Sequence, residues 1–316
     1  LVREDLALVT PRYHEREDHN VFLFRNLFGV WRREAQFIQR SQMSSGLGLK
    51  AGALGEDAVA LGFPFVSTAS SRFAGLVEVH RRQGSAWSLS AALRPESPSD
   101  GMRFGTEVAL DGDWIAVGAP GDPGTSNSQD PGRVFVYRWQ SGAYVLKQTL
   151  TPADGVARDR FGMRLDFTGG QLLVTAAQHV GLPGEDAGAV YVYSLQNEQW
   201  VLADKLATAS GSGVAVDGDL LITSRRVPGT LELVSYTRQQ GMWQLATERP
   251  RLPFQDEVQS LAVVEGLPTR VGFVFETEGS LPPLVFVSEL EGDAWGAPYR
   301  IYSAANSITP FRPLSL

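Results

Sequence analysis

Short apolar runs recur along the chain, and an aromatic residue follows each run at a fixed distance. One such run ends at Tyr137, and Tyr144 follows seven residues later. The same spacing occurs six times, and the aromatic markers are Trp31, Trp87, Tyr144, Trp200, Trp243 and Trp295. The separation between successive markers varies along the chain, which indicates a structural repeat with insertions in its loops.

Within each repeat, the pattern of apolar and polar positions predicts four short strands. In the best-preserved repeat, the first strand ends at Asp111-Gly112, and we expect further strands near 113–119, 133–138 and 143–150. Asp111-Gly112 and Asp217-Gly218 suit the positive φ angles of a two-residue hairpin turn. The third strand is rich in Val, Phe and Tyr, which favour β-structure.

A four-stranded unit of this size cannot bury both faces of its sheet alone, but radial packing of several units covers the faces. We therefore predict an all-β chain that forms a single β-propeller domain over residues 1–316, with six blades and seven as an alternative. The repeats span 1–41, 42–99, 100–156, 157–209, 210–256 and 257–303. The first repeat lacks an opening strand. We expect residues 304–316 to supply it, so that the N- and C-terminal strands pair and close the ring.

Two Phe-Gly pairs, Phe104-Gly105 and Phe161-Gly162, stand at the same place in two successive repeats, and Gly118-Ala119-Pro120 follows the first pair. These residues match the two halves of the FG-GAP motif. The chain thus resembles the FG-GAP repeat β-propeller proteins, which include the integrin α-subunit propeller. The resemblance implies a binding module in adhesion or signalling outside the cytoplasm. Many members carry a calcium loop of the form Asp-x-Asp-x-Asp-Gly, but the turn at 111–113 is too short to wrap a cation. We expect no metal and no cofactor.

Charge and composition narrow the range of partners. The net charge of −7 and the scattered basic residues argue against nucleic-acid binding, which relies on clustered Lys and Arg. The absence of cysteine excludes disulfides and thiolate chemistry. No apolar run is long enough to span a bilayer, and we expect no membrane insertion. We expect an extracellular or periplasmic location, which is compatible with a place in a larger surface protein.

No catalytic motif stands out. His14 and His19 enclose a cluster of acidic residues, and both residue types can bind zinc or a similar metal. Six consecutive loop residues, however, rarely place three metal ligands in a tetrahedral array. Residues 46–51 match a relaxed dinucleotide-binding pattern without the required strand and helix around it. The Gly-x-Ser-x-Gly elbow is absent. We assign no catalytic residue. The alternative is a propeller enzyme of polysaccharide lyase or glycoside hydrolase type with an axial pocket, because carboxylates from two loops can converge.

The loops between the second and third strands vary most between repeats, and strand alternation places them on one face. They cover residues 11–20, 64–74, 120–132, 177–188, 224–230 and 276–283. Loops on a rigid scaffold commonly carry binding residues. We therefore predict a non-enzymatic binding module that uses this face for a protein or carbohydrate ligand. The candidate ligand-binding residues are His14, Asp18, Asp122, Asp130, His179, Glu185 and Asp186.

Overall fold

The computed structural model of the chain is all-β. It describes residues 2–3, 5–9, 20–38, 49–121, 130–168, 170–176, 187–209, 214–217, 219–227, 230–239, 241–245, 251–252, 258–264, 269–275, 284–291, 294–295 and 299–302. None of these residues forms a helix long and apolar enough to cross a membrane. The chain divides into two compact units. One consists of Leu1–Phe167 with Leu195–Trp200, and the other of Thr168–Ser194 with Val201–Leu316.

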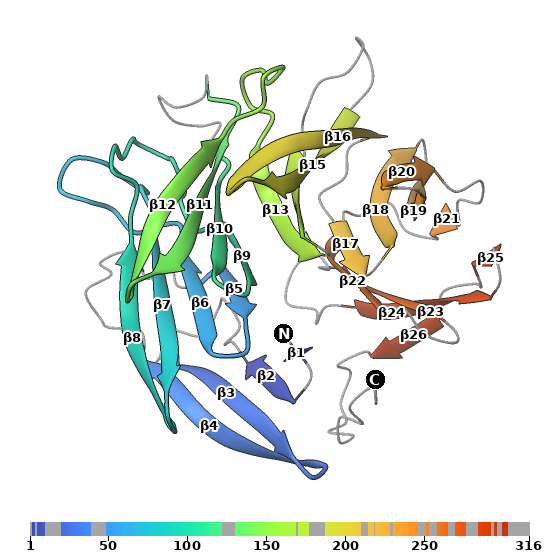
Figure 1. Cartoon of the computed structure of the whole chain (residues 1–316). Helices are drawn as coiled ribbons and strands as arrows, with labels where there is room; N and C mark the ends of the chain where they lie inside the picture. Colours follow the sequence, from blue (N-terminus) through green and yellow to red (C-terminus); the bar gives the residue numbers. More distant parts are fainter. Residues whose placement is uncertain are drawn as a thin grey trace. The chain divides into compact units, whose positions relative to one another are not determined.

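The described residues form six sheets, and within each sheet the first four strands pair in chain order (Figure 1). The first sheet contains β1 (Val2–Arg3), β2 (Leu6–Val9), β3 (Asn20–Leu27) and β4 (Val30–Ile38). The second contains β5 (Ala51–Leu54), β6 (Ala58–Phe63), β7 (Leu76–Gln83) and β8 (Ala86–Leu93). The third contains β9 (Glu107–Asp111), β10 (Trp114–Ala119), β11 (Arg133–Gln140) and β12 (Ala143–Leu150). The predicted strands of the best-preserved repeat are therefore confirmed.

The other three sheets repeat this plan with small additions. The fourth contains β13 (Phe161–Thr168), β14 (Gln171–Ala176), β15 (Ala187–Gln196) and β16 (Gln199–Ala209). The fifth contains β17 (Val214–Asp217), β18 (Leu220–Val227), β19 (Thr230–Gln239), β20 (Met242–Leu245) and β21 (Arg251–Leu252). The sixth contains β22 (Val258–Val264), β23 (Thr269–Phe275), β24 (Leu284–Glu291), β25 (Ala294–Trp295) and β26 (Tyr299–Tyr302). Both β20 and β21 pair with β19, and both β25 and β26 pair with β24, so the fourth strand of these sheets is in two pieces.

The first sheet has an opening strand, contrary to the sequence prediction. Residues Val2 and Arg3 form β1 and pair with Ala7 and Leu6 of β2. The apolar pattern did not reveal β1 because it is only two residues long and contains an arginine. Residues 304–316, which were expected to fill this position, lie outside the described residues.

The first hairpin turn of a repeat lies one residue later than predicted. Asp111 pairs with Trp114, which leaves Gly112 and Asp113 as the two turn residues. The carbonyl of Asp113 accepts a hydrogen bond of 2.8 Å from the backbone N–H of Trp139 in the third strand. The same contact recurs in three other sheets, where it joins Asn26 to Asp5, Arg82 to Asp57 and Arg238 to Asp219. The turn aspartate thus fastens the third strand to the first hairpin.

The apolar cores lie between successive sheets. One core joins the first and second sheets and includes Leu8, Leu23, Val59 and Phe63. A second core joins the second and third sheets and includes residues such as Val79, Ile115 and Val117. A third core lies within the other compact unit and joins the fourth and fifth sheets, where Leu173, Val192 and Leu221 are buried. These sheets therefore cover their faces with their neighbours.

The Phe-Gly pairs sit where one sheet touches the backbone of the preceding sheet. A Cβ atom added to Gly118, at the end of β10, would lie 2.1 Å from the carbonyl oxygen of Gly162. A Cβ atom on Gly62, at the equivalent place in β6, would lie 2.2 Å from the carbonyl oxygen of Gly105. Only glycine permits such a close approach of two backbones.

A second glycine contact flanks each Phe-Gly pair. Gly75 forms a parallel bridge with Phe104, and Gly132 forms the same bridge with Phe161. Both glycines have positive φ angles, at +96° and +102°. The two phenylalanine side chains are completely buried. Each Phe-Gly pair therefore attaches the start of the first strand of its own sheet to the loop of the preceding sheet.

We expect Gly118→Ala to lower the free energy of unfolding by about 2–4 kcal/mol, because the added methyl group would collide with a backbone carbonyl that cannot rotate away. Urea denaturation of the purified chain would measure the effect. Gly55→Ala is the matched control, since its nearest atom would lie at an ordinary 3.4 Å, and it should change stability by less than about 1 kcal/mol. Equal effects of the two substitutions would contradict the proposed contact.

Candidate binding site

The structure describes one of the residues predicted to bind ligand. Asp130 lies shortly before β11, in the loop between the second and third strands of the third sheet. The other candidates fall outside the described residues, and they are His14, Asp18, Asp122, His179, Glu185 and Asp186. Their roles stay predictions.

Both carboxylate oxygens of Asp130 are engaged by the protein. Its Oδ1 accepts a hydrogen bond of 2.9 Å from the backbone N–H of Gly132. Its Oδ2 accepts hydrogen bonds from Arg133 Nε at 3.0 Å and Nη2 at 2.6 Å. The side chain is only 9% exposed. Asp130 therefore holds Gly132 against Phe161. A ligand that bound the carboxylate of Asp130 would compete with the hydrogen bonds from Gly132 and Arg133.

In the equivalent loop of the second sheet, residues 64–75, two aromatic rings lie between two arginines, one from the loop and one from the connection to the third sheet. The guanidinium of Arg72 lies 5.4 Å from the ring of Phe73, and that of Arg103 lies 5.3 Å from the ring of Phe65. The two rings meet edge to face with centroids 6.0 Å apart. Arg72 is exposed, and the other three side chains are partly exposed. The stack presents a cationic and aromatic surface to solvent.

Hydrogen bonds fix this loop at several points. Within it, Ser67 Oγ accepts a bond from the backbone N–H of Phe73 at 3.1 Å, and Thr68 Oγ1 accepts one from that of Ser71 at 3.0 Å. Asp100, in the connection to the third sheet, accepts a bond of 2.8 Å from the backbone N–H of Arg72. The loop is therefore held in one arrangement before any ligand arrives, which lowers the entropic cost of binding.

Backbone strain concentrates in the same region. Phe73 and Arg103 have φ angles of +51° and +56°, in the left-handed region that side chains with a Cβ disfavour. Arg158 and Arg160, in the next connection between sheets, have φ angles of +73° and +57°. Such strain persists where the surrounding contacts fix the backbone, and it is common at functional sites.

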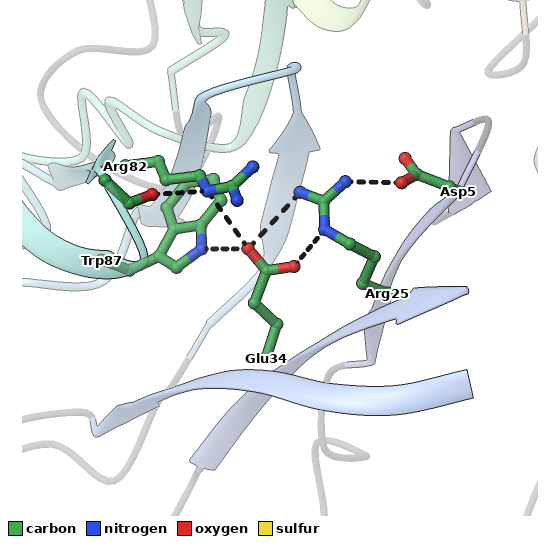
Figure 2. A network of polar contacts seen from close by, with 6 residues as sticks. Asp5, Arg25, Glu34, Arg82 and Trp87 are labelled. Atoms are coloured by element: carbon green, nitrogen blue, oxygen red, sulfur yellow. Dashed lines mark hydrogen bonds and ion pairs between the residues drawn. The ribbon is translucent and has the colours of Figure 1, made fainter. Parts of the chain in front are cut away.

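A polar network joins the first two sheets near their hairpin turns (Figure 2). Glu34 lies at its centre, where it accepts a hydrogen bond of 2.8 Å from Trp87 Nε1 and forms an ion pair with Arg25. Arg25 also contacts Asp5 at 2.5 Å, and Arg82 Nε lies 3.6 Å from Glu34. Burial alone would raise the pKa of Glu34, but the hydrogen bonds from Arg25 and Trp87 outweigh it and lower the pKa. Glu34 therefore stays ionised and is poorly suited to act as a general acid.

A polar pocket of about 340 Å³ adjoins this network. Its lining side chains carry both signs of charge, and they are Asp5, Leu6, Arg25, Gly55, Glu56, Asp57 and Arg82. Asp57 forms an ion pair with Arg81, and Arg81 lies 4.4 Å from the ring of Trp139. The charged groups largely compensate one another.

Three of the six aromatic markers found in the sequence connect successive sheets. Trp87 donates to Glu34 of the preceding sheet, and the Tyr144 hydroxyl accepts a bond of 3.2 Å from Arg81 of its preceding sheet. The side-chain amide of Gln148 accepts a hydrogen bond of 2.8 Å from the backbone N–H of Trp200 in the next sheet, and it donates one of 2.9 Å to the carbonyl of Trp200. These aromatic residues therefore have a structural role, which explains their regular spacing.

Charged residues also lie near the start of successive sheets. Glu107 and Arg164 occupy corresponding positions in two consecutive repeats, and Lys50 directly precedes β5 of the second sheet. Glu107 contacts Arg164 at 2.9 Å, and burial raises its pKa against the opposing effects of Arg164 and Lys50. A carboxylate between two cations does not reproduce the paired carboxylates of glycoside hydrolysis. In the part of the chain that is described, no group of three or more His, Asp or Glu side chains could hold a metal ion.

Sequence reasoning missed the stack of Arg72, Phe73, Phe65 and Arg103. The predicted ligand contacts were all polar or charged loop residues, whereas two phenylalanines in a serine-rich loop were the useful signal. Phe65 and Phe73 occupy the positions that Gly121 and Asp130 hold in the next repeat, so corresponding loop positions carry different chemistry in neighbouring repeats.

Comparison with known proteins identifies the repeats and the fold. The FG-GAP repeat family matches residues 87–137 and 144–193. A chain of the nidogen/laminin complex is similar at a TM-score of 0.50 and 9% identity, over 93% of this chain and 93% of that chain. A chain of the mitotic checkpoint complex gives a TM-score of 0.56 at 10% identity, over 96% and 75% of the two chains. TolB from Acinetobacter baumannii gives 0.50 at 10% identity, over 94% and 64%.

The nidogen and TolB chains are β-propellers, so these similarities show the fold. At 9–10% identity they carry no information on ligands. No curated protein matches the sequence.

The lowered pKa of Glu34 predicts a pH-dependent loss of stability. The ionised form is favoured in the folded chain, so its contribution is complete above the ordinary pKa of 4.5 and is lost as the pH falls through the lower, folded-state pKa. We expect Glu34→Gln to reduce stability by about 1–2 kcal/mol at neutral pH, because Arg25 loses a charged partner.

Thermal melts of the wild type and Glu34→Gln from neutral pH to pH 3 would test this expectation. The difference between the two melting temperatures should shrink below pH 4.5. Ser88→Ala, on an exposed position of β8, controls for the general effect of acid. A difference that is constant across the pH range would contradict the assignment.

Proposed function

Because the chain is an FG-GAP repeat protein with a β-propeller fold, we propose that it is a non-enzymatic binding module. It recognises a protein or carbohydrate ligand through the loops between the second and third strands. FG-GAP repeats occur in extracellular proteins, which supports an extracellular or periplasmic location. A place within a larger surface protein fits the same proposal.

The observation that carries this proposal is the exposed stack in loop 64–75. Arg72 and Phe73 form its outer end, on a backbone held by Ser67 and Asp100. Arginine and aromatic residues dominate the energetics of many protein interfaces because they combine a large contact area with directed hydrogen bonds. An aromatic ring also offers a stacking surface for a sugar, and the guanidinium pairs with carboxylate groups.

The repeat plan explains how one scaffold acquires specificity. The glycine contacts at Gly75 and Gly132 fix where each loop ends, while the loop residues themselves differ between repeats. Asp130 stands at the position equivalent to Phe73, and Gln129 at that of Arg72. The proposed surface therefore combines cationic and aromatic groups from one repeat with polar groups from the next, including Asp122 and Asp130. His14, Asp18, His179, Glu185 and Asp186 would contribute from other loops of this face.

We propose that the blades form a ring of six. The six sheets among the described residues support this count. Glu107 contacts the cation of Arg164 and is not paired with a second carboxylate, so it does not support a glycosidase-type catalytic centre. The enzyme alternative is therefore not favoured.

We expect Arg72→Ala and Phe73→Asn to weaken ligand binding at least about tenfold, since truncation of an interface anchor removes a large part of the contact energy. Arg72→Ala should change stability by less than about 0.5 kcal/mol because the side chain is exposed. Asn tolerates the positive φ of Phe73, which makes it the least disruptive replacement there.

A glycan array and a pull-down with the purified chain would identify the ligand, and titration calorimetry would give the affinities of the variants. Asp111→Asn, at the last residue of β9 beside the hairpin turn of the opposite face, is the matched control. Loss of binding in this control with normal binding in both loop variants would show that binding was assigned to the wrong face.

A further inference from the structure

The hairpin between β3 and β4 ends in an exposed apolar tip. Leu27, Phe28 and Val30 are 43%, 105% and 54% exposed. Leu27 pairs with Val30, so Phe28 and Gly29 form a two-residue turn. We refer to residues 27–30 as the apolar tip. It lies at the hairpin-turn end of the sheet, away from the proposed ligand-binding loops.

Phe28 occupies a backbone conformation that does not suit it. Its φ is +55° and that of Gly29 is +85°, as in a type I′ turn, where Asn, Asp and Gly are favoured. The Oδ1 atom of Asn26 accepts a hydrogen bond of 2.8 Å from the N–H of Gly29 and holds the turn closed. Phe28 therefore combines backbone strain with complete exposure of an aromatic ring, and neither stabilises the folded chain.

The equivalent hairpins show that the fold does not require an apolar tip. The turn residues are Gly84 and Ser85 in the second sheet, Ser141 and Gly142 in the third, and Asn197 and Glu198 in the fourth. Ser141 and Asn197 adopt nearly the same φ as Phe28, at +50° and +48°. The turn geometry is thus available to polar residues, and among these four sheets the apolar tip is particular to the first.

Basic residues follow the apolar tip on β4. Arg32 and Arg33 are both exposed, and among the described residues neither forms an ion pair with an acidic side chain. Glu34 points into the network with Arg25 and Trp87 instead (Figure 2), so its charge is compensated. Trp31 stands between the apolar tip and the arginines and is partly exposed.

We propose that the β3–β4 hairpin binds an anionic lipid surface, with the apolar tip in the membrane interface and Arg32 and Arg33 at the lipid phosphates. At about 3.3 Å per residue, the two arginines lie about 7–10 Å beyond Val30. This distance matches the depth of about 5–10 Å to which interfacial segments enter the boundary of headgroups and acyl chains. Tryptophan is enriched at that boundary, which suits the position of Trp31.

The shape of the apolar tip favours a lipid surface over a protein pocket. The tip is a narrow projection at the end of a two-stranded hairpin, and a fluid bilayer accepts it without a complementary cavity. The net charge of −7 on the whole chain does not oppose the contact strongly, because salt screens charges beyond about 8 Å under physiological conditions. The expectation of no membrane insertion concerned segments that span a bilayer, and this inference revises it for the hairpin.

Vesicle co-sedimentation tests the proposal, with vesicles of phosphatidylcholine alone or mixed with phosphatidylglycerol. The wild type should bind the mixed vesicles more strongly than the neutral ones. Phe28→Asn should lower the partition coefficient about tenfold or more, because the largest apolar side chain of the tip is lost. Arg32→Gln with Arg33→Gln should remove the preference for the anionic vesicles.

Fluorescence can locate the contact because the chain has no cysteine. An environment-sensitive dye on Leu27→Cys should shift to the blue when mixed vesicles are added. The same dye on Ser85→Cys, at the polar turn between β7 and β8, is the matched control and should not shift. A shift at Ser85 equal to that at Leu27 would overturn the proposal.

Stability measurements separate this function from a structural role for the tip. Phe28→Asn should leave the melting temperature unchanged or raise it, since Asn suits the positive φ. A clear fall in the melting temperature would mean that Phe28 packs within the folded chain, and it would overturn the proposal. So would the absence of vesicle binding by the wild type, equal binding to both kinds of vesicle, or unchanged binding of Phe28→Asn.

Discussion

The close approach of glycine backbones between successive sheets is the constraint on which the described structure depends. Gly118 meets Gly162, and Gly62 meets Gly105, at distances that leave no room for a Cβ atom. Because backbone is in contact with backbone, the separation of the sheets at this end is set without adjustable side chains. The apolar cores then fill the space that remains between the sheet faces.

The same constraint determines where the loop surface can form. Each loop leaves the sheet just after the glycine of the second strand and returns just before a second glycine, Gly75 or Gly132, that touches the next Phe-Gly pair. The positions of both ends of the loop are thereby fixed, while the amino acids between them can differ from one repeat to the next. Arg72 and Phe73 lie two to three residues before Gly75, and their side chains reach the surface, so their chemistry can differ from that of other repeats without altering the contact between sheets.

The sequence was sufficient to predict elements that depend on local pattern. Aromatic spacing and the Asp-Gly turns identified the repeats and the strands of the third sheet, although the turn lies one residue later. Partners distant in sequence could not be predicted in this way. Glu34 binds Trp87 of the following sheet, and no local pattern distinguishes Glu34 from glutamates that are exposed. The short strand β1 and the positive φ of Phe28 also depend on tertiary context, because two residues are too few to form a pattern and a side chain with a Cβ disfavours a positive φ.

The two ends of the sheets differ in how function can be added to the repeat. At the loop end, backbone contacts between sheets anchor residues 64–75, so a binding surface there is rigid and is built from neighbouring repeats. At the hairpin end, a type I′ turn is closed by its own strand pairing and accepts Phe28, Ser141 or Asn197 with similar φ. A single hairpin can therefore change its chemistry independently of the others. This difference explains how one repeat can carry an apolar tip while the regular contacts between sheets are retained.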